Sequence, residues 1–157
     1  MLNPTTPPEA AAKPAGPTGR KVVVTGGTRG IGRETVDRFV AMGDTVVSLS
    51  TSGAPVDNAL SLACDVADPQ AVEQAMKQAV EALGGLDVLV VNAGIVRDNL
   101  MARMSAEDFS AVIQTNLMGG FYSVKAGIRP LIRSSRGRVI FCSSTCLLYT
   151  SPSPRDS

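Results

Sequence analysis

The chain has 157 residues, which is enough for one hydrophobic core and too few for two ordinary domains. Its charges nearly cancel at a net +1 and no apolar run reaches the length of a membrane span, so we expect neither a nucleic-acid nor a membrane partner. The absence of histidine excludes Ser-His-Asp and Cys-His catalysis, and three cysteines without zinc-type pairing predict no metal site and a reducing, cytoplasmic setting.

The sequence alternates between strand-like and helix-like patterns after an initial segment, 1–19. That segment is rich in proline, alanine and threonine and has no signal-peptide core, so we expect a disordered tail. The expected strands are 21–25, 45–50, 60–64, 87–92 and 138–143, and the expected helices are 30–42, 69–83 and 105–133, the last broken or bent. Little helix is expected within 43–65. The alternation predicts an α/β fold, a Rossmann-like doubly wound parallel sheet in a single domain.

A glycine-rich turn joins the first strand to the first helix in the stretch KVVVTGGTRGIG, residues 21–32. Glycines let a backbone turn tightly and approach a ligand closely. The N-terminus of the following helix presents free N–H groups to a pyrophosphate. We therefore expect a dinucleotide-binding turn, the alternative being a glycine turn without a ligand. The inward face of this helix is expected at Ile31, Val36, Phe39 and Val40.

The ends of the other helices carry capping signals. Asp68 before a proline is typical of an N-cap, and Gly84-Gly85 is typical of a helix end. Ser105 and Asp108 have the spacing of a capping box at the start of the third helix. The inward face of this third helix is expected at Phe109, Val112, Ile113 and Leu117.

The end of the second expected strand bears on the choice of cofactor. NAD-binding units usually carry an acidic residue there, about 20 residues past the glycines, for the ribose 2′-hydroxyl. This chain has Ser50, Thr51 and Ser52 instead, and Arg29 in the glycine turn can pair with a 2′-phosphate. We therefore expect NADP rather than NAD. The alternative is a solvated Arg29 and a lax choice of cofactor.

Several short motifs together resemble the short-chain dehydrogenase/reductase family. They are Thr-Gly-x-x-x-Gly-x-Gly from Thr25, then Asp65-Val66, Asn92-Ala93-Gly94, Thr115-Asn116-Leu117 and the strand that ends at Ser143-Ser144. The resemblance implies that Ser144 hydrogen-bonds the substrate carbonyl and that Asn116 links to a water where its helix opens. It also implies cofactor contacts from Thr25, Gly26, Thr28, Arg29, Gly30, Ile31, Gly32, Ser50, Thr51, Asp65, Val66, Asn92, Ala93 and Gly94. Taken alone, Asp65 and Ser144 also fit ordinary turns, and Asn116 also fits a solvent-facing position.

The segment from Asn92 to Met104 is similar, within that family, to the 3-oxoacyl-[acyl-carrier-protein] reductases. This similarity implies NADPH-dependent reduction of a 3-oxoacyl thioester, carried by acyl carrier protein or CoA, to its 3-hydroxyacyl form in fatty-acid synthesis. It also implies that the full-length protein is a homotetramer or a dimer. A basic rim for an acidic carrier, or else a solvated helix end, is expected at Arg129, Arg133, Arg136 and Arg138.

The family's proton donor is a Tyr-x-x-x-Lys pair beyond the serine, in which the lysine lowers the pKa of the tyrosine. Neither Tyr122 nor Tyr149 is followed by a lysine at that spacing. The last segment, 146–157, begins CLLYTSPSPRD, has no strand or helix pattern and resembles a translated sequencing adapter. We therefore expect 20–145 to be an incomplete NAD(P)-binding domain, truncated after the fifth strand and inactive as written. The alternatives are a natural divergent tail and a non-catalytic dinucleotide-binding or regulatory protein.

Overall fold

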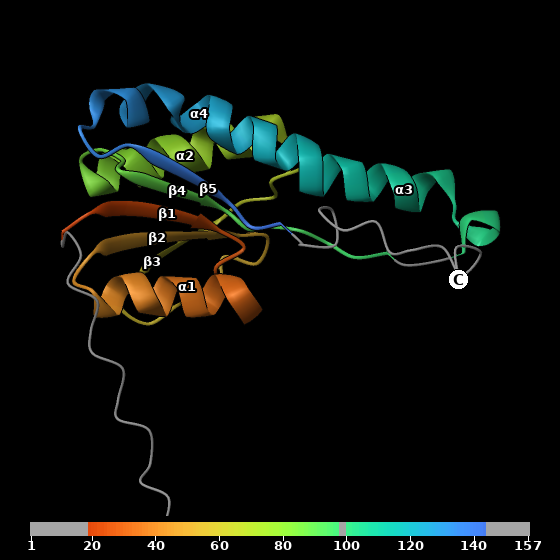
Figure 1. Ribbon diagram of the computed structural model, residues 1–157, viewed down its shortest axis with the longest axis horizontal. Helices are drawn as coiled ribbons and strands as arrows, with labels where there is room; N and C mark the ends of the chain where they lie inside the picture. Colours follow the sequence, from red (N-terminus) through yellow and green to blue (C-terminus); the bar gives the residue numbers. More distant parts are fainter. Residues whose placement is uncertain (1–18, 98–99, 144–157) are drawn as a thin grey trace, which may run out of the picture.

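The protein contains a five-stranded parallel sheet. A computed structural model describes residues 19–97 and 100–143 (Figure 1). The strands are β1 (Lys21–Thr25), β2 (Thr45–Ser50), β3 (Leu60–Ala63), β4 (Val88–Val91) and β5 (Arg138–Phe141). Their order is β3-β2-β1-β4-β5, and every pair is parallel. This order confirms the predicted Rossmann-like sheet, and it reverses between β1 and β4, the place where such sheets bind ligands.

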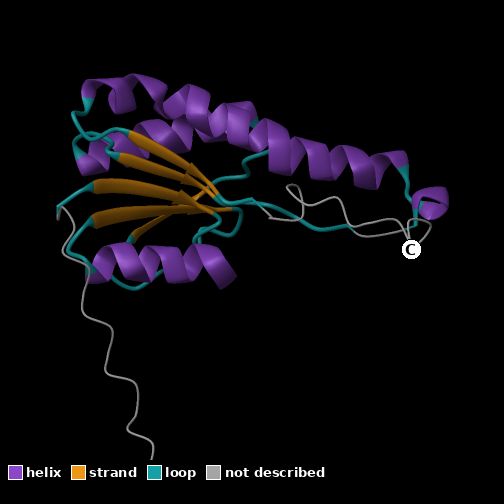
Figure 2. Ribbon diagram, in the orientation of Figure 1, coloured by secondary structure: helices purple, strands orange, loops and turns teal. Residues whose placement is uncertain are grey.

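Helices cover both faces of the sheet, as predicted. Helix α1 (Gly30–Ala41) lies against one face, whereas α2 (Pro69–Leu83) and α4 (Gly119–Arg133) lie against the other (Figure 2). Strand residues therefore alternate between two cores. Val22 and Val24 face the core under α1, and Val23 faces the core under α2 and α4. The near-continuous apolar strands follow from burial on both faces.

The capping signals of α2 form as the sequence predicts. The Asp68 carboxylate accepts hydrogen bonds from the backbone N–H groups of Gln70 and Ala71, at 2.8 and 3.3 Å. Gly84 ends the helix in the left-handed region, with φ at 66°. No helix lies between β2 and β3, which also confirms the expectation for this stretch.

The third expected helix is a rod of three consecutive segments, preceded by a short 3-10 turn, η1 (Met101–Arg103). The rod comprises α3 (Ala106–Ile113), a π-helical turn η2 (Gln114–Met118) and α4. In η2 the backbone N–H of Gly119 donates to the carbonyl of Gln114, five residues earlier. The predicted interruption is therefore a π turn. Ser105 caps α3, since its hydroxyl accepts from the N–H of Asp108 at 3.0 Å.

Two of the predicted inward faces are wrong in part. Phe109 and Leu117 are 55% and 63% exposed, and α3 buries no residue. The reason is that α3 projects past the sheet, while α4 lies over it (Figure 1). Ile31 is 72% exposed, because the first turn of α1 stands at the edge of the sheet. Val36 and Phe39 lie in the core as predicted, and Val40 packs against it.

Asp44 holds the amino ends of β1 and β2 together. Its fully buried carboxylate accepts from the backbone N–H of Arg20 at 2.8 Å and from the Arg20 guanidinium at 2.6 Å. The same guanidinium stacks over the Phe39 ring at 5.1 Å. The pKa of Arg20 is raised, chiefly by its hydrogen bond to Asp44.

Asp87 joins the amino ends of β1, β4 and β5. Its carboxylate accepts from the N–H of Lys21 at 2.9 Å, from the Ser134 hydroxyl at 2.5 Å and from Arg136 at 3.4 Å. Its backbone carbonyl accepts from the N–H of Arg138 at 2.9 Å. Burial by itself would raise the pKa of Asp87, but these hydrogen bonds and the nearby cations outweigh it and hold the pKa below its ordinary value.

Among the described residues, no helix is both long and apolar enough to cross a membrane.

Candidate functional site

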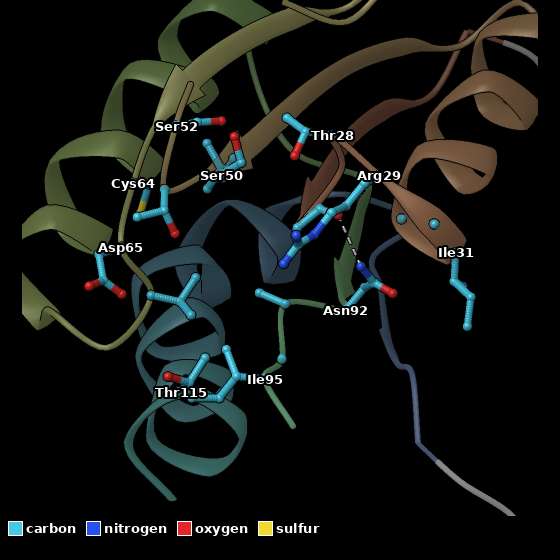
Figure 3. A pocket seen from close by; sticks show the side chains of 18 residues that line it. Thr28, Arg29, Ile31, Ser50, Ser52, Cys64, Asp65, Asn92, Ile95 and Thr115 are labelled. Atoms are coloured by element: carbon cyan, nitrogen blue, oxygen red, sulfur yellow. Dashed lines mark hydrogen bonds between the residues drawn. The ribbon is translucent and has the colours of Figure 1, made fainter. Parts of the chain in front are cut away.

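A cleft of about 770 Å³ opens at the carboxyl ends of the strands, above the point where the strand order reverses (Figure 3). Four strand ends and the π turn contribute its walls. The lining residues are Gly26, Thr28, Arg29, Gly30, Ile31, Gly32, Leu49, Ser50, Thr51, Ser52, Cys64, Asp65, Val66, Asn92, Ala93, Gly94, Ile95 and Thr115. The structure thus brings together every cofactor residue implied by the resemblance except Thr25.

The glycine turn after β1 is packed tightly against the end of β4. The side-chain amide of Asn92 donates to the carbonyls of Thr25 and Gly26 at 3.1 and 3.2 Å. A Cβ on Gly32 would collide with the Gly26 carbonyl and this amide, so the close approach requires glycine. Helix α1 begins at once and has no side-chain cap, so its first N–H groups are left for an anion in the cleft.

Thr25 lies behind the wall of the cleft. Its side chain is fully buried and does not line the cleft. Its hydroxyl oxygen accepts from the N–H groups of Asn92 and Ala93 at 3.0 and 3.1 Å. Because these bonds join β1 to the end of β4, Thr25 positions the wall of the cleft, and its direct contact with a cofactor stays a prediction.

The end of β2 offers hydroxyls and no carboxylate to the cleft. Ser50 and Ser52 accept hydrogen bonds from the N–H groups of Gly53 and Ala54, which shapes the turn that follows. Arg29 extends from the glycine turn into the middle of the cleft (Figure 3). Within 19–97 and 100–143 it has no carboxylate partner, so its charge is available to an anionic ligand.

The end of β3 forms the adjoining wall. Asp65 is exposed and one of its carboxylate oxygens accepts from the N–H of Ala67 at 2.9 Å, while Val66 is buried. Cys64, which the sequence analysis did not assign to the site, also lines the cleft and is 4% exposed. Burial, with the nearby charges of Asp65 and Asp68, raises the pKa of its thiol to about 11. The thiol is therefore protonated near neutral pH.

The opposite wall consists of Asn92 to Ile95, the first part of the segment 92–97 that leaves β4. Asn116 holds it from the π turn: its side-chain oxygen accepts from the N–H of Ile95 at 2.8 Å, and its amide nitrogen donates to the Ile95 carbonyl at 3.0 Å. The oxygen and the nitrogen of this amide thus both bond to the backbone of Ile95. Thr115, its neighbour, lines the cleft. That Asn116 orders a water stays a prediction.

Two groups of predicted residues do not take part in the described cleft. Ser144 lies outside the described residues, so its catalytic role stays a prediction. The basic residues proposed for a carrier protein lie between the last turns of α4 and the start of β5, at the edge opposite the cleft: Arg129, Arg133, Arg136 and Arg138. Arg136 is already paired with Asp87. A docking role for them is untested. Among the described residues, no group of three or more metal-ligating side chains occurs.

The sequence matches the family profile described as short chain dehydrogenase over residues 20–153. The match runs past Thr145, where the sequence analysis ended the domain, so that boundary stays a prediction.

Curated relatives include 3-oxoacyl-[acyl-carrier-protein] reductases. FabG of Vibrio cholerae is 37% identical over 130 residues, which cover 78% of this chain and 53% of the relative. FabG of Escherichia coli (strain K12) is 37% identical over 134 residues, which cover 80% and 55%. MabA of Mycobacterium tuberculosis is 41% identical over 126 residues, which cover 80% and 51%. The chain spans about half the length of the curated relatives it matches.

Solved structures show the same arrangement. A short chain dehydrogenase from Burkholderia cenocepacia J2315, in complex with NADP, superposes with a TM-score of 0.79 at 30% identity, covering 86% of this chain and 59% of the other. The ligand-free aldohexose dehydrogenase of Thermoplasma acidophilum gives a TM-score of 0.75 at 33% identity, covering 82% and 50%.

Proposed function

The chain belongs to the short-chain dehydrogenase family, and on that premise we propose that it carries the NADPH-binding half of a 3-oxoacyl thioester reductase. The observation that supports this most directly is the cleft above the reversal of strand order. Its glycine turn is packed so closely that a Cβ at Gly32 would collide with it. Bound NADPH would supply a hydride to the substrate carbonyl. The chain's own residues would bind it, orient it and shield it from water.

The topology suggests how a dinucleotide would lie in this cleft. The N-terminus of α1 and the glycine turn would receive the pyrophosphate. The adenosine half would lie over the ends of β2 and β3, where Asp65 and Val66 line the cleft. The nicotinamide half would then lie over the end of β4, against the segment 92–97.

We propose NADPH over NADH because of the charges near the end of β2. The hydroxyls of Ser50 and Thr51 do not repel a 2′-phosphate, and Arg29 can pair with it. One charge-assisted contact would give a preference of about tenfold or more. The Kd values of the full chain for NADPH and NADH, from nicotinamide fluorescence, test this. Arg29→Ala should reduce the difference, and Arg38→Ala, which removes a surface ion pair with Glu34, should leave it unchanged. Equal affinities in the wild type would contradict the proposal.

The substrate assignment rests on the named relatives and on two side chains. Asn116 stands beside the nicotinamide wall, and Ser144 would hydrogen-bond the substrate carbonyl. The printed sequence has no Tyr-x-x-x-Lys pair to deliver the proton. We therefore expect the chain alone to show no measurable reduction of acetoacetyl thioesters, since general acid catalysis contributes about 10²–10⁴-fold.

A chimera tests the reductase against the second candidate, a non-catalytic dinucleotide-binding protein. In it, the C-terminal half of a reductase of this family replaces 146–157. NADPH-dependent reduction of an acetoacetyl thioester is the expected result, and Ser144→Ala should cost far more rate than the matched control Ser143→Ala. A folded chimera that binds NADPH without turnover would favour the non-catalytic protein.

A further inference from the structure

The segment 92–97, whose first part forms a wall of the cleft, is held to the rod of helices at two points. This segment leaves the end of β4 and contains neither helix nor strand, so the sheet fixes only its first two residues, Asn92 and Ala93. Its residues Asn92 to Ile95 line the cleft. Beyond the hydrogen bonds that fix Asn92 and Ala93 to the end of β1, the segment is bonded to side chains of α3 and the π turn.

The first attachment is the double hydrogen bond between Asn116 and the backbone of Ile95. The second lies two residues further along, where the guanidinium of Arg97 donates to the carboxylate of Asp108 at 2.9 Å. Both partners stand on the rod, Asp108 in the first turn of α3 and Asn116 in the π turn. Residues 95 and 97 of the segment are therefore both attached to the rod.

Asp108 is well suited to be the fixed partner of this pair. Its backbone N–H is bonded to the hydroxyl of Ser105, so its position in the helix is set. A complete capping box would direct the carboxylate back to the start of the helix. In this structure the carboxylate is bonded to Arg97 instead.

We propose that Arg97, through its ion pair with Asp108, is a positioning residue for the nicotinamide half of the site. The pair fixes the far end of the segment, so that Asn116 can hold the Ile95 backbone at the cleft. Arg97 itself is not among the residues that line the cleft. The inference rests on the proposed function, which places the nicotinamide against this wall.

The predicted effect is selective for one half of the dinucleotide. Both side chains are partly exposed, at 55% and 38%, so the pair is expected to be weak to moderate. Arg97→Ala should raise the Kd for NADPH by about two- to fivefold. It should leave unchanged the Kd for 2′-phospho-ADP-ribose, which keeps the adenosine, pyrophosphate and second ribose but lacks the nicotinamide.

The test measures both ligands on the full chain in a double-mutant cycle. Arg97→Ala, Asp108→Asn and the double variant should show the same loss for NADPH, because each removes the same interaction. Arg97→Lys should retain most of the affinity. Arg38→Ala, which breaks an exposed arginine pair on α1, is the matched control and should change neither Kd.

Amide hydrogen exchange at Ile95 provides a readout that needs no ligand. Its N–H is bonded to Asn116, and exchange should become faster in Arg97→Ala but not in Arg38→Ala. Two results would overturn this inference and leave the proposed function intact. One is an equal rise in the Kd values of both ligands in Arg97→Ala, and the other is an unchanged Kd for NADPH in an Arg97→Ala protein that binds both ligands. If the wild type binds neither ligand, the proposed function fails and this inference fails with it.

Discussion

The amino edge of the sheet, where the strands begin, and the carboxyl edge, where they end, are built in opposite ways. At the amino edge, Asp44 and Asp87 are buried carboxylates whose partners lie at the start of β1 and just after the end of α4. At the carboxyl edge, glycines, hydroxyls and an uncapped helix N-terminus surround an open cleft. The two carboxylates at the amino edge are already bonded within the protein, so they are not available to a ligand. The comparison indicates that stability is concentrated at one edge and binding at the other, and three substitutions test that separation.

The largest expected effect is at the amino edge. Asp44→Ala leaves the Arg20 guanidinium, which is 17% exposed, without its buried partner. Loss of one member of such a pair should lower the free energy of unfolding by about 3 kcal/mol. Urea denaturation followed by circular dichroism measures this. Asp57→Ala, which removes an 88% exposed partner of Arg33, should cost less than about 1 kcal/mol. Equal costs for the two variants would contradict the comparison.

A carboxyl-edge substitution should have the reverse effect. In Gly32→Ala the added methyl group meets the Gly26 carbonyl and the Asn92 amide, so the turn must move out of its binding position. We expect the affinity for NADPH to fall about a hundredfold, which corresponds to about 2.7 kcal/mol. The free energy of unfolding should change by less than about 1 kcal/mol. In the control Gly30→Ala, no atom lies within 4 Å of the new methyl group. Its effect should be smaller than that of Gly32→Ala, about 1 kcal/mol from backbone strain at its φ of 54°. Loss of the fold in Gly32→Ala would argue against separate edges.

The smallest expected effect is a pH dependence at Asp87. Because its pKa is lowered in the folded state, its contribution to stability is complete above the pKa of an unfolded aspartate and disappears as the pH falls through the folded value. Asp87→Asn should be less stable than the wild type by about 1.5 kcal/mol at pH 7. The difference should shrink below about pH 4. Denaturation curves at several pH values measure it, and a difference that grows on acidification would refute the assignment.

Local features of the fold were predictable from the sequence. Asp68, Gly84 and Ser105 act within a few residues of themselves, so the helix ends they predict are found. The charged contacts of the amino edge were not predictable. Arg20 and Asp44 are 24 residues apart, and Asp87 and Ser134 are 47 apart, and an acid before a strand usually indicates only a turn. Such pairs arise from the topology of the sheet.

The candidate site shows the same division. The glycine turn and the strand-end residues are found around the cleft, because parallel strands end at one edge. The side chain of Thr25 turns toward β4 while its neighbours line the cleft, and its contact with a cofactor stays a prediction. Cys64 and Thr115 were missed, although each directly precedes a residue assigned to the site. Adjacency to Asp65 and Asn116 was the signal that could have found them.

The π turn has a consequence for how the length of this chain can vary. A hydrogen bond that spans five residues takes up one residue more than an α-helical bond, so the two ends of the rod are out of phase by one position, about 100° of rotation. Deleting one residue within 114–118 would restore an unbroken α-helix and rotate Asn116 away from Ile95. The number of residues in this turn is therefore as constrained as their identity.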